Sequence, residues 1–131
     1  MKLTTTMQVS VDGVMQAPGG PDEDRGGGFE RSGWAMPLVD NEVMTFVEQV
    51  YRRADAFLFG RRTFELFAGY WGAMEAGSHP IADALNTRPK YVASTTLTDP
   101  QWADTTVLSG DVAAAVGELK AKLGGELQVH G

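Results

Sequence analysis

The sequence predicts an α/β fold in which a mostly parallel central sheet carries helices on both faces. Two observations lead to this prediction. Segments with strand character alternate with segments of helical periodicity along the 131 residues. Residues 56–59 are continuously apolar, as expected of a strand that is buried on both faces of a parallel sheet. With 43% hydrophobic residues, the chain is long enough for one core, so we expect a single domain over residues 1–131.

The first quarter of the chain predicts a strand followed by a long loop. Residues 3–11 are rich in Thr and Val, which favours a strand that ends before Gly13. Residues 14–38 hold many glycines and prolines and show no periodicity. Loops of this length are uncommon in compact domains and tend to be functional, so we expect a lid, mobile at residues 18–30 without ligand. A surface insertion without function is the alternative.

The middle of the chain predicts helices and short strands in alternation. Asp40 is placed to cap a helix with apolar residues three or four positions apart. These apolar positions are Val43, Phe46, Val47, Val50 and Tyr51. The buried strand at 56–59 runs through Gly60 into a second helix that begins near Arg61. A short helix at 80–85 and strands at 91–93 and 105–108 follow.

The last helix and strand are predicted close to the end of the chain. Residues 111–123 place Val112, Val116, Leu119 and Leu123 on one helical face, and Gly124 ends the helix. Residues 127–129 form the last predicted strand. The chain stops after a strand, where an α/β protein normally turns into its next helix. We therefore expect that the C-terminal part of the domain is missing and that an edge of the sheet is left uncovered.

Composition excludes several classes of function. The net charge is −6 and no run of Lys or Arg could form a large basic face, so nucleic acid is not an expected partner. The chain has no cysteine, and His79 and His130 lack the spacing of metal ligands, so no metal site is expected. No apolar run approaches the ~18 residues of a membrane span. We expect a cytoplasmic protein that does not bind membranes.

The most informative stretch runs from Gly60 to Glu65. Two arginines lie on the first turn of a helix, where cations oppose the helix dipole. A bound phosphate explains this placement, because unpaired backbone amides and guanidinium groups both bind phosphate oxygens. The alternative is a solvated pair of arginines bonded to acidic neighbours such as Glu65.

Three further positions are weaker candidates for ligand contacts. Ser94 and Thr95 follow a predicted strand and could offer hydroxyls to a phosphate or ribose, although such residues are usually part of a turn. Asp12 is expected beyond the carboxyl end of the first strand, where it could hold a substrate hydroxyl or relay a proton; an Asp-Gly turn is the alternative. Trp34 could cover a flat ring or anchor the loop.

Five segments in one order carry a family resemblance. They are Val-Ser-Val-Asp-Gly at 9–13, Gly-Trp-Ala-Met-Pro at 33–37, Phe-Gly-Arg-Arg-Thr-Phe-Glu at 59–65, Lys-Tyr-Val-Ala-Ser at 90–94 and Leu-Gln-Val-His-Gly at 127–131. Their order resembles the dihydrofolate-reductase-like family, in particular the branch akin to the C-terminal reductase domain of the riboflavin-biosynthesis deaminase/reductase. The resemblance covers essentially the whole chain and implies a three-layer dihydrofolate-reductase-like fold.

The resemblance implies a site for NADPH. Gly60, Arg61, Arg62 and Thr63 would cradle its phosphates, with Arg61 nearest the adenosine 2′-phosphate. Ser94 and Thr95 would face the adenosine half, and Gly131 would lie under the pyrophosphate. Thr95 stands where many relatives carry an arginine, so NADH is not excluded as the cofactor.

The resemblance also implies candidate catalytic residues. Val9 would pass the nicotinamide with its backbone, the 14–38 loop would act as the lid, and Asp12 is similar to the aspartate that faces the substrate in riboflavin-type reductases. Asp12 and Trp34 are therefore the candidate catalytic residues. The acidic residue that dihydrofolate reductase uses for protonation has no match, so folate reduction is not implied.

These observations predict an NADPH-dependent reductase that transfers hydride to a small heteroaromatic or imine-like substrate, related to a pteridine or a pyrimidine. A non-catalytic nucleotide- or flavin-binding module of the same fold is the alternative. A third interpretation is that only a more complete polypeptide binds ligand. The expected partner is a small molecule, and a homodimer is compatible with the resemblance.

Overall fold

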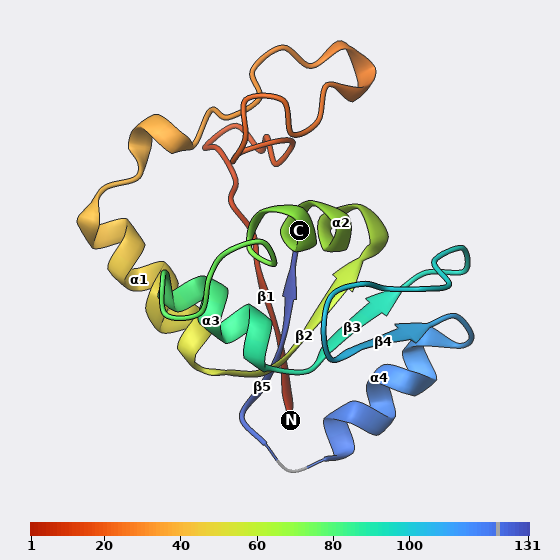
Figure 1. Cartoon of the computed structure of the whole chain (residues 1–131). Coiled ribbons are helices and arrows are strands. Elements are labelled where there is room, and N and C mark those ends of the chain that lie inside the picture. Colours follow the sequence, from red (N-terminus) through yellow and green to blue (C-terminus); the bar gives the residue numbers. More distant parts are fainter. Residues whose placement is uncertain (123) are drawn as a thin grey trace. The chain divides into compact units, whose positions relative to one another are not determined.

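The computed structural model describes residues 1–122 and 124–131 (Figure 1). It consists of two compact units. The sheet unit comprises Met1–Thr6 and Glu48–Gly131, and the loop unit comprises Met7–Val47. We describe each unit by itself.

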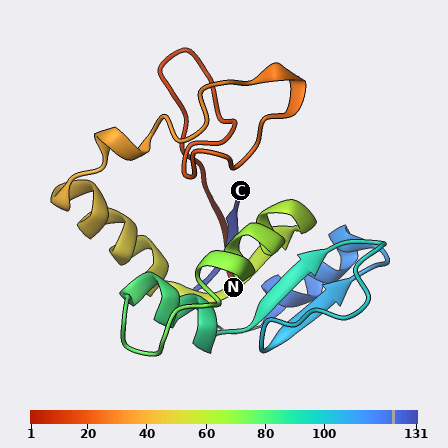
Figure 2. The same cartoon turned by 45° about the horizontal axis from the view of Figure 1, so that its top comes forward.

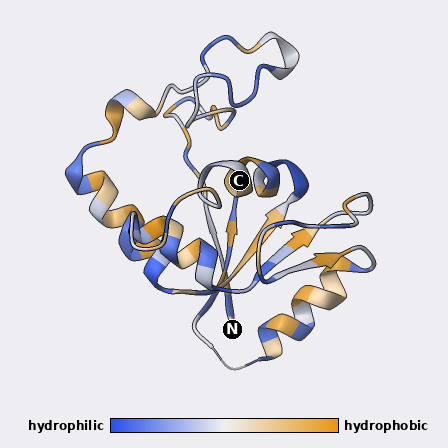
Figure 3. Ribbon diagram, viewed as in Figure 1, coloured by the Kyte–Doolittle hydropathy of each residue, from blue (hydrophilic) through white to orange (hydrophobic). Residues whose placement is uncertain are grey.

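A parallel sheet forms the centre of the sheet unit. Five described strands pair in the order β1 (Lys2–Thr6), β5 (Glu126–His130), β2 (Ala54–Gly60), β3 (Lys90–Ala93) and β4 (Thr105–Leu108), and every neighbouring pair is parallel. The predicted parallel sheet is therefore confirmed. β2 has a strand on each side and four successive buried residues, 56–59, as its apolar sequence predicts (Figure 3).

Four α-helices accompany the described strands, each close to its predicted position. They are α1 (Asn41–Arg52), α2 (Arg61–Tyr70), α3 (Pro80–Thr87) and α4 (Val112–Ala121). Asp40 caps α1 by accepting from the amide of Val43 at 2.8 Å, and Asp111 caps α4 by accepting from the amide of Ala114 at 3.0 Å. Leu123, predicted on the apolar face of the last helix, lies outside the described residues.

The sheet carries helices on both faces, which confirms the predicted three-layer arrangement. On one face, Leu119 of α4 packs against Ala56, Leu58 and Leu127. The other face carries α2 (Figure 2). The ring of Phe64 of α2 lies 6.3 Å from that of Phe59. Neighbouring residues of a strand point to opposite faces, so one continuous apolar run supplies both layers of the core.

The first strand is shorter than predicted, and the last strand lies inside the sheet. β1 ends at Thr6, not at Val11, because its one partner strand, β5, pairs with it only as far as Thr6 and His130. The last strand does not lie at an edge of the sheet, since β5 lies between β1 and β2. The expectation that an edge of the sheet is left uncovered stays a prediction.

The loop unit is irregular over most of its length, as the glycines and prolines predict. It contains two short 3₁₀ turns, Gly26–Gly28 and Met36–Leu38, before α1 begins. Glu23 organises its first half, because Oε2 accepts from the amides of Gly19 at 2.9 Å and Gly20 at 2.7 Å. The mobility of residues 18–30 stays a prediction.

Candidate functional site

The start of α2 differs from the starts of the other described α-helices. Asp40, His79 and Asp111 cap α1, α3 and α4 with their side chains, whereas Gly60 precedes α2 and supplies no cap. The first amides of a helix have no partner within the helix, and the positive end of the helix dipole lies there. Because α2 directly follows β2, these amides lie at the carboxyl end of a central strand, where open α/β sheets bind their ligands.

Gly60 leaves open space at this helix start. Apart from its two neighbours in the sequence, a Cβ at position 60 would meet no described atom within 4 Å. The backbone of Gly60 has φ −75° and ψ 161°, a conformation that any residue adopts. Neither packing nor backbone conformation explains the glycine, whereas close approach of a ligand to the backbone would.

The two arginines of the first turn are exposed and differ in their contacts. Arg61 donates from Nε to Glu65 Oε1 at 2.9 Å, and its guanidinium also donates to Thr96 Oγ1. Arg62 forms no ion pair with any residue that the structure describes. The contact with Glu65 is the one expected of solvated arginines. An ion pair this exposed contributes less than about 1 kcal/mol, whereas a charge-assisted bond to phosphate contributes about 1.5–3 kcal/mol. The ion pair therefore does not prevent anion binding.

The end of β5 closes on the same helix start. Gly131 has a φ of +114°, and a Cβ there would overlap with Oγ1 of Thr63. Only glycine fits both the backbone conformation and the close approach. The structure thus brings Gly131 together with the 60–63 turn, two segments that lie far apart in the sequence.

The predicted hydroxyls after β3 form a turn. Ser94 Oγ accepts from the amides of Thr96 at 3.2 Å and Leu97 at 3.1 Å, as in the turn that was the alternative to a ligand contact. Thr95 is exposed. Because Thr96 also bonds Arg61, this turn lies beside the start of α2.

The loop unit contains an open, largely apolar hollow of about 320 Å³. Its lining includes Met7, Gln8, Val9, Trp34, Ala35, Leu38, Val39 and Val43. The indole of Trp34 donates to the carbonyl of Gln16 at 2.9 Å, so this side chain anchors the loop and also forms a wall of the hollow. Val9 and Trp34 are thus brought together, and their apolar surroundings suit a flat ring.

Asp12 lies on a turn of the loop unit. β1 ends at Thr6, so Asp12 follows the carboxyl end of this strand at a greater distance along the chain than the predicted strand end at Val11 implied. Asp12 is exposed, its Oδ1 accepts from Ser10 Oγ at 2.5 Å, and Gly13 adopts φ +92°. This is the Asp-Gly turn that was the alternative interpretation. Asp12 is not among the lining residues of the hollow.

Sequence reasoning missed two buried polar groups of the sheet unit. Lys90 is fully buried, and its Nζ donates to the carbonyls of Leu85 at 2.8 Å and Arg88 at 2.9 Å. Burial lowers the pKa of Lys90, and the carboxylate of Asp104 partly opposes this shift. Three hydrophobic residues, Tyr91, Val92 and Ala93, follow Lys90 in the sequence, and they do not indicate that the lysine itself is buried.

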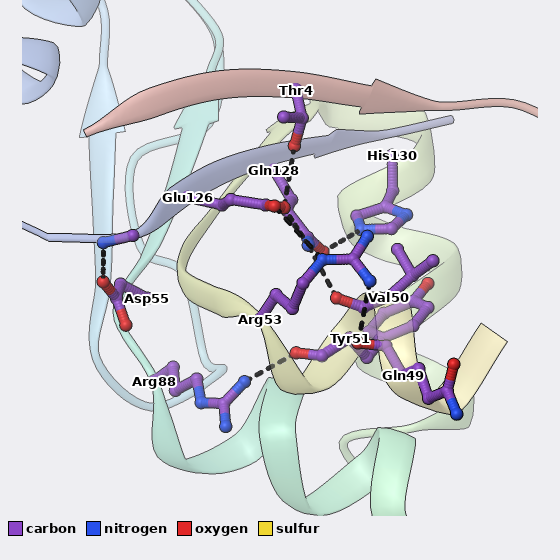
Figure 4. A network of polar contacts seen from close by, with 11 residues as sticks. Thr4, Gln49, Val50, Tyr51, Arg53, Asp55, Arg88, Glu126, Gln128 and His130 are labelled. Carbon is purple, nitrogen blue, oxygen red and sulfur yellow. Dashed lines mark hydrogen bonds and ion pairs between the residues drawn. The ribbon is translucent and has the colours of Figure 1, made fainter. Parts of the chain in front are cut away.

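The second missed group is a row of polar residues on β5. Glu126, Gln128 and His130 alternate with apolar residues and form a hydrogen-bonded network with α1 (Figure 4). Polar residues at every second position of a strand indicate that they share one face of the sheet, so this pattern could have predicted the network. Among the described residues no cluster suited to a metal ion occurs. Within residues 1–122 and 124–131, no helix has the length and apolar character that a membrane span requires.

A parallel α/β sheet with an uncapped helix start after a central strand is an arrangement typical of proteins that bind phosphate-bearing ligands. The family model for the RibD C-terminal domain matches residues 1–131. The chain therefore belongs to this family, the reductase-type C-terminal domain of the riboflavin-biosynthesis deaminase/reductase. The recognition from five sequence segments is confirmed.

The fold is also found in a solved structure. The chain resembles a candidate riboflavin biosynthesis protein from Shewanella sp. PV-4 with a TM-score of 0.58 and 22% sequence identity. The match covers 100% of this chain and 65% of the other, so the chain spans less than two thirds of that protein. No curated protein matches the chain. The dihydrofolate-reductase-like α/β fold is confirmed, and the family is associated with NADPH-dependent reduction.

Proposed function

We propose that this chain is the nucleotide-binding part of a reductase that uses NADPH to reduce a small heteroaromatic or imine-like substrate, related to a pteridine or a pyrimidine. The observation that carries the proposal is the uncapped start of α2, where Gly60 leaves open space beside two exposed arginines. Family membership supports the choice of cofactor. When bound, NADPH would supply the hydride.

The sheet unit offers a donor set that fits the phosphates of NADPH. The amides of the first turn of α2 and the guanidinium of Arg62 would bind phosphate oxygens, and Gly131 would lie under the pyrophosphate. Arg61 would exchange Glu65 for the 2′-phosphate. Ser94 and Thr95 would face the adenosine half. Each of these roles uses a residue that is at the α2 start or in the turn beside it.

For the loop unit we propose that the hollow beside Val9 and Trp34 receives a flat ring. The apolar lining would exclude water from that ring, which favours hydride transfer over side reactions. Asp12 would contact the substrate from the neighbouring turn, and this role requires that its carboxylate leave Ser10.

One observation favours the non-catalytic alternative, a nucleotide- or flavin-binding module. The described lining of the hollow contains no titratable side chain, so no proton donor is identified there. Binding of NADPH without turnover of any pteridine or pyrimidine substrate would support that alternative.

Substitution of Gly60 tests the proposed phosphate contact. Gly60→Ala adds one methyl group in open space, so the variant should keep the stability of the wild type. The methyl group would occupy the space that a phosphate needs, and we expect NADPH binding to weaken at least tenfold, which is about 1.4 kcal/mol. Gly117→Ala is the matched control, because its Cβ also meets nothing within 4 Å and it lies in α4. Calorimetry measures both affinities, and equal affinity of the two variants would contradict the proposal.

Substitution of Arg61 tests the choice between the two nicotinamide cofactors. The 2′-phosphate is the group that separates NADPH from NADH, and a charge-assisted bond to it contributes about 1.5–3 kcal/mol. Arg61→Ala should therefore weaken NADPH binding by about one to two orders of magnitude. NADH binding should change much less. Equal losses for both cofactors would assign Arg61 to the pyrophosphate or to structure instead.

A further inference from the structure

The polar residues of β5 lie in an unexpected place. β5 is an inner strand, and two of its buried residues are polar: Gln128 is fully buried and His130 is only 5% exposed. With Glu126 they share one face of the strand, because side chains alternate between faces with a period of two. Burying polar groups is unfavourable unless every group finds a partner. We call Glu126, Gln128 and His130 the β5 ladder (Figure 4).

The hydrogen bonds of Gln128 determine which ring nitrogen of His130 carries a hydrogen. Gln128 Nε2 contacts the carbonyl of Val50 at 2.7 Å and Glu126 Oε2 at 2.7 Å. Both partners can only accept, so this atom must be the amide nitrogen, and the amide oxygen Oε1 faces His130. Since that oxygen also only accepts, His130 Nε2, at 3.0 Å, must carry the hydrogen. The ladder thus selects the Nε2–H tautomer.

The surroundings of His130 keep its imidazole neutral. The ring stacks on Tyr51 of α1 at 4.5 Å and lies 5.8 Å from Phe57 of β2 and 6.5 Å from Phe67 of α2. Burial also raises the pKa of Tyr51, so this titratable neighbour stays neutral. The charges of the network lie at the other end of the ladder, where Glu126 accepts from Arg53 at 3.2 Å.

The His130 end of the β5 ladder lies beside the candidate nucleotide site. Gly131 directly follows His130 and lies against Thr63 in the first turn of α2. We propose that the β5 ladder is a positioning device: by holding His130 as the Nε2–H tautomer, it fixes the end of β5, and Gly131 with it, against the start of α2. The consequence for nucleotide affinity depends on the proposed function, whereas the tautomer and the position of Gly131 do not.

Two substitutions separate positioning from simple packing. His130→Phe keeps an aromatic ring beside Tyr51 but removes the donor to Gln128, and a buried amide oxygen is left unpaired. His130→Gln loses the ring but carries an N–H group at about the position of Nε2. If His130 only fills space, Phe should be the better replacement. If it positions the strand end, Gln should be better.

The first measurement uses the wild-type chain and needs no ligand. Long-range ¹H–¹⁵N NMR of the imidazoles reports the tautomer, and His79→Gln assigns the signals because the chain has two histidines. We expect Nε2–H at neutral pH. An Nδ1–H tautomer or a charged imidazole would overturn the proposal.

The second measurement follows the site. We expect hydrogen exchange at the amides of Thr63 and Gly131 to accelerate in His130→Phe and to stay near the wild-type rate in His130→Gln. NADPH affinity should fall roughly tenfold in the Phe variant, the effect of losing one net hydrogen bond, and less than threefold in the Gln variant. If the Phe variant matches the wild type, or if Phe preserves the site better than Gln, the proposal is wrong. If the wild type itself fails to bind NADPH, the proposed function fails, while the tautomer and the exchange rates still decide the ladder's role.

Discussion

Protonation of His130 should destabilise the sheet unit when the pH is lowered. Burial lowers the pKa of this imidazole from 6.5 to about 4 in the folded chain. The unfolded chain therefore binds more protons than the folded chain between these two pH values, and stability falls as the pH is lowered through that window. Above pH 6.5 the contribution is fully present and constant. One pKa unit corresponds to 1.36 kcal/mol, so the loss amounts to about 3 kcal/mol, a large part of the stability of a small domain.

Urea unfolding, followed by tryptophan fluorescence at pH values from 7.5 to 4, measures this loss. Carboxylates also titrate near the lower end of the range, so the comparison is between the wild type and His130→Gln, which retains the hydrogen bond to Gln128 but cannot be protonated. His79→Gln controls for the second histidine. The free energy of unfolding should fall more steeply in the wild type and in His79→Gln than in His130→Gln. Parallel curves for the wild type and His130→Gln would refute the reasoning.

Two further substitutions have expected outcomes. Glu65→Gln removes the exposed 2.9 Å ion pair with Arg61. NADPH binding should tighten by a few-fold, because the guanidinium no longer exchanges Glu65 for the phosphate. An unchanged or weaker affinity would show that Arg61 does not leave Glu65. Lys90→Met keeps the apolar stem but leaves the carbonyls of Leu85 and Arg88 without their donor. The free energy of unfolding in urea should therefore fall by about 1–3 kcal/mol. Equal or greater stability would mean that the cost of burying the charge outweighs its hydrogen bonds.

Local sequence patterns were sufficient where one element determines its own structure. The apolar run 56–59 predicted an inner strand, and Asp40 and Asp111 predicted the starts of two helices. The start of α2 was recognised as a candidate phosphate site because the conflict between arginine charge and helix dipole is visible within a few residues.

Features that depend on pairing between distant segments could not be predicted in this way. The sequence pattern predicts a first strand as far as Val11, because nothing in that segment indicates how far β5 accompanies it. The contact of Gly131 with Thr63 follows from strand order, which the sequence pattern leaves open. The tautomer of His130 requires the carbonyl of Val50, which lies 78 residues before Gln128.

The insertion of β5 between β1 and β2 also has a consequence for how the chain folds. Thr4 and Glu126, which meet in the finished sheet, are 122 residues apart in the sequence. During synthesis, β1 and β2 are both made long before the strand that joins them. In the meantime β1 lacks its partner strand, and β2 presents an unpaired backbone edge. Pairing over such a separation slows folding, because the entropy of closing the loop is lost before any contact is gained. The pairing of β5 with β1 and β2 is therefore completed last, and a nascent chain that ends before Glu126 exposes strand edges of β1 and β2 that are open to wrong partners.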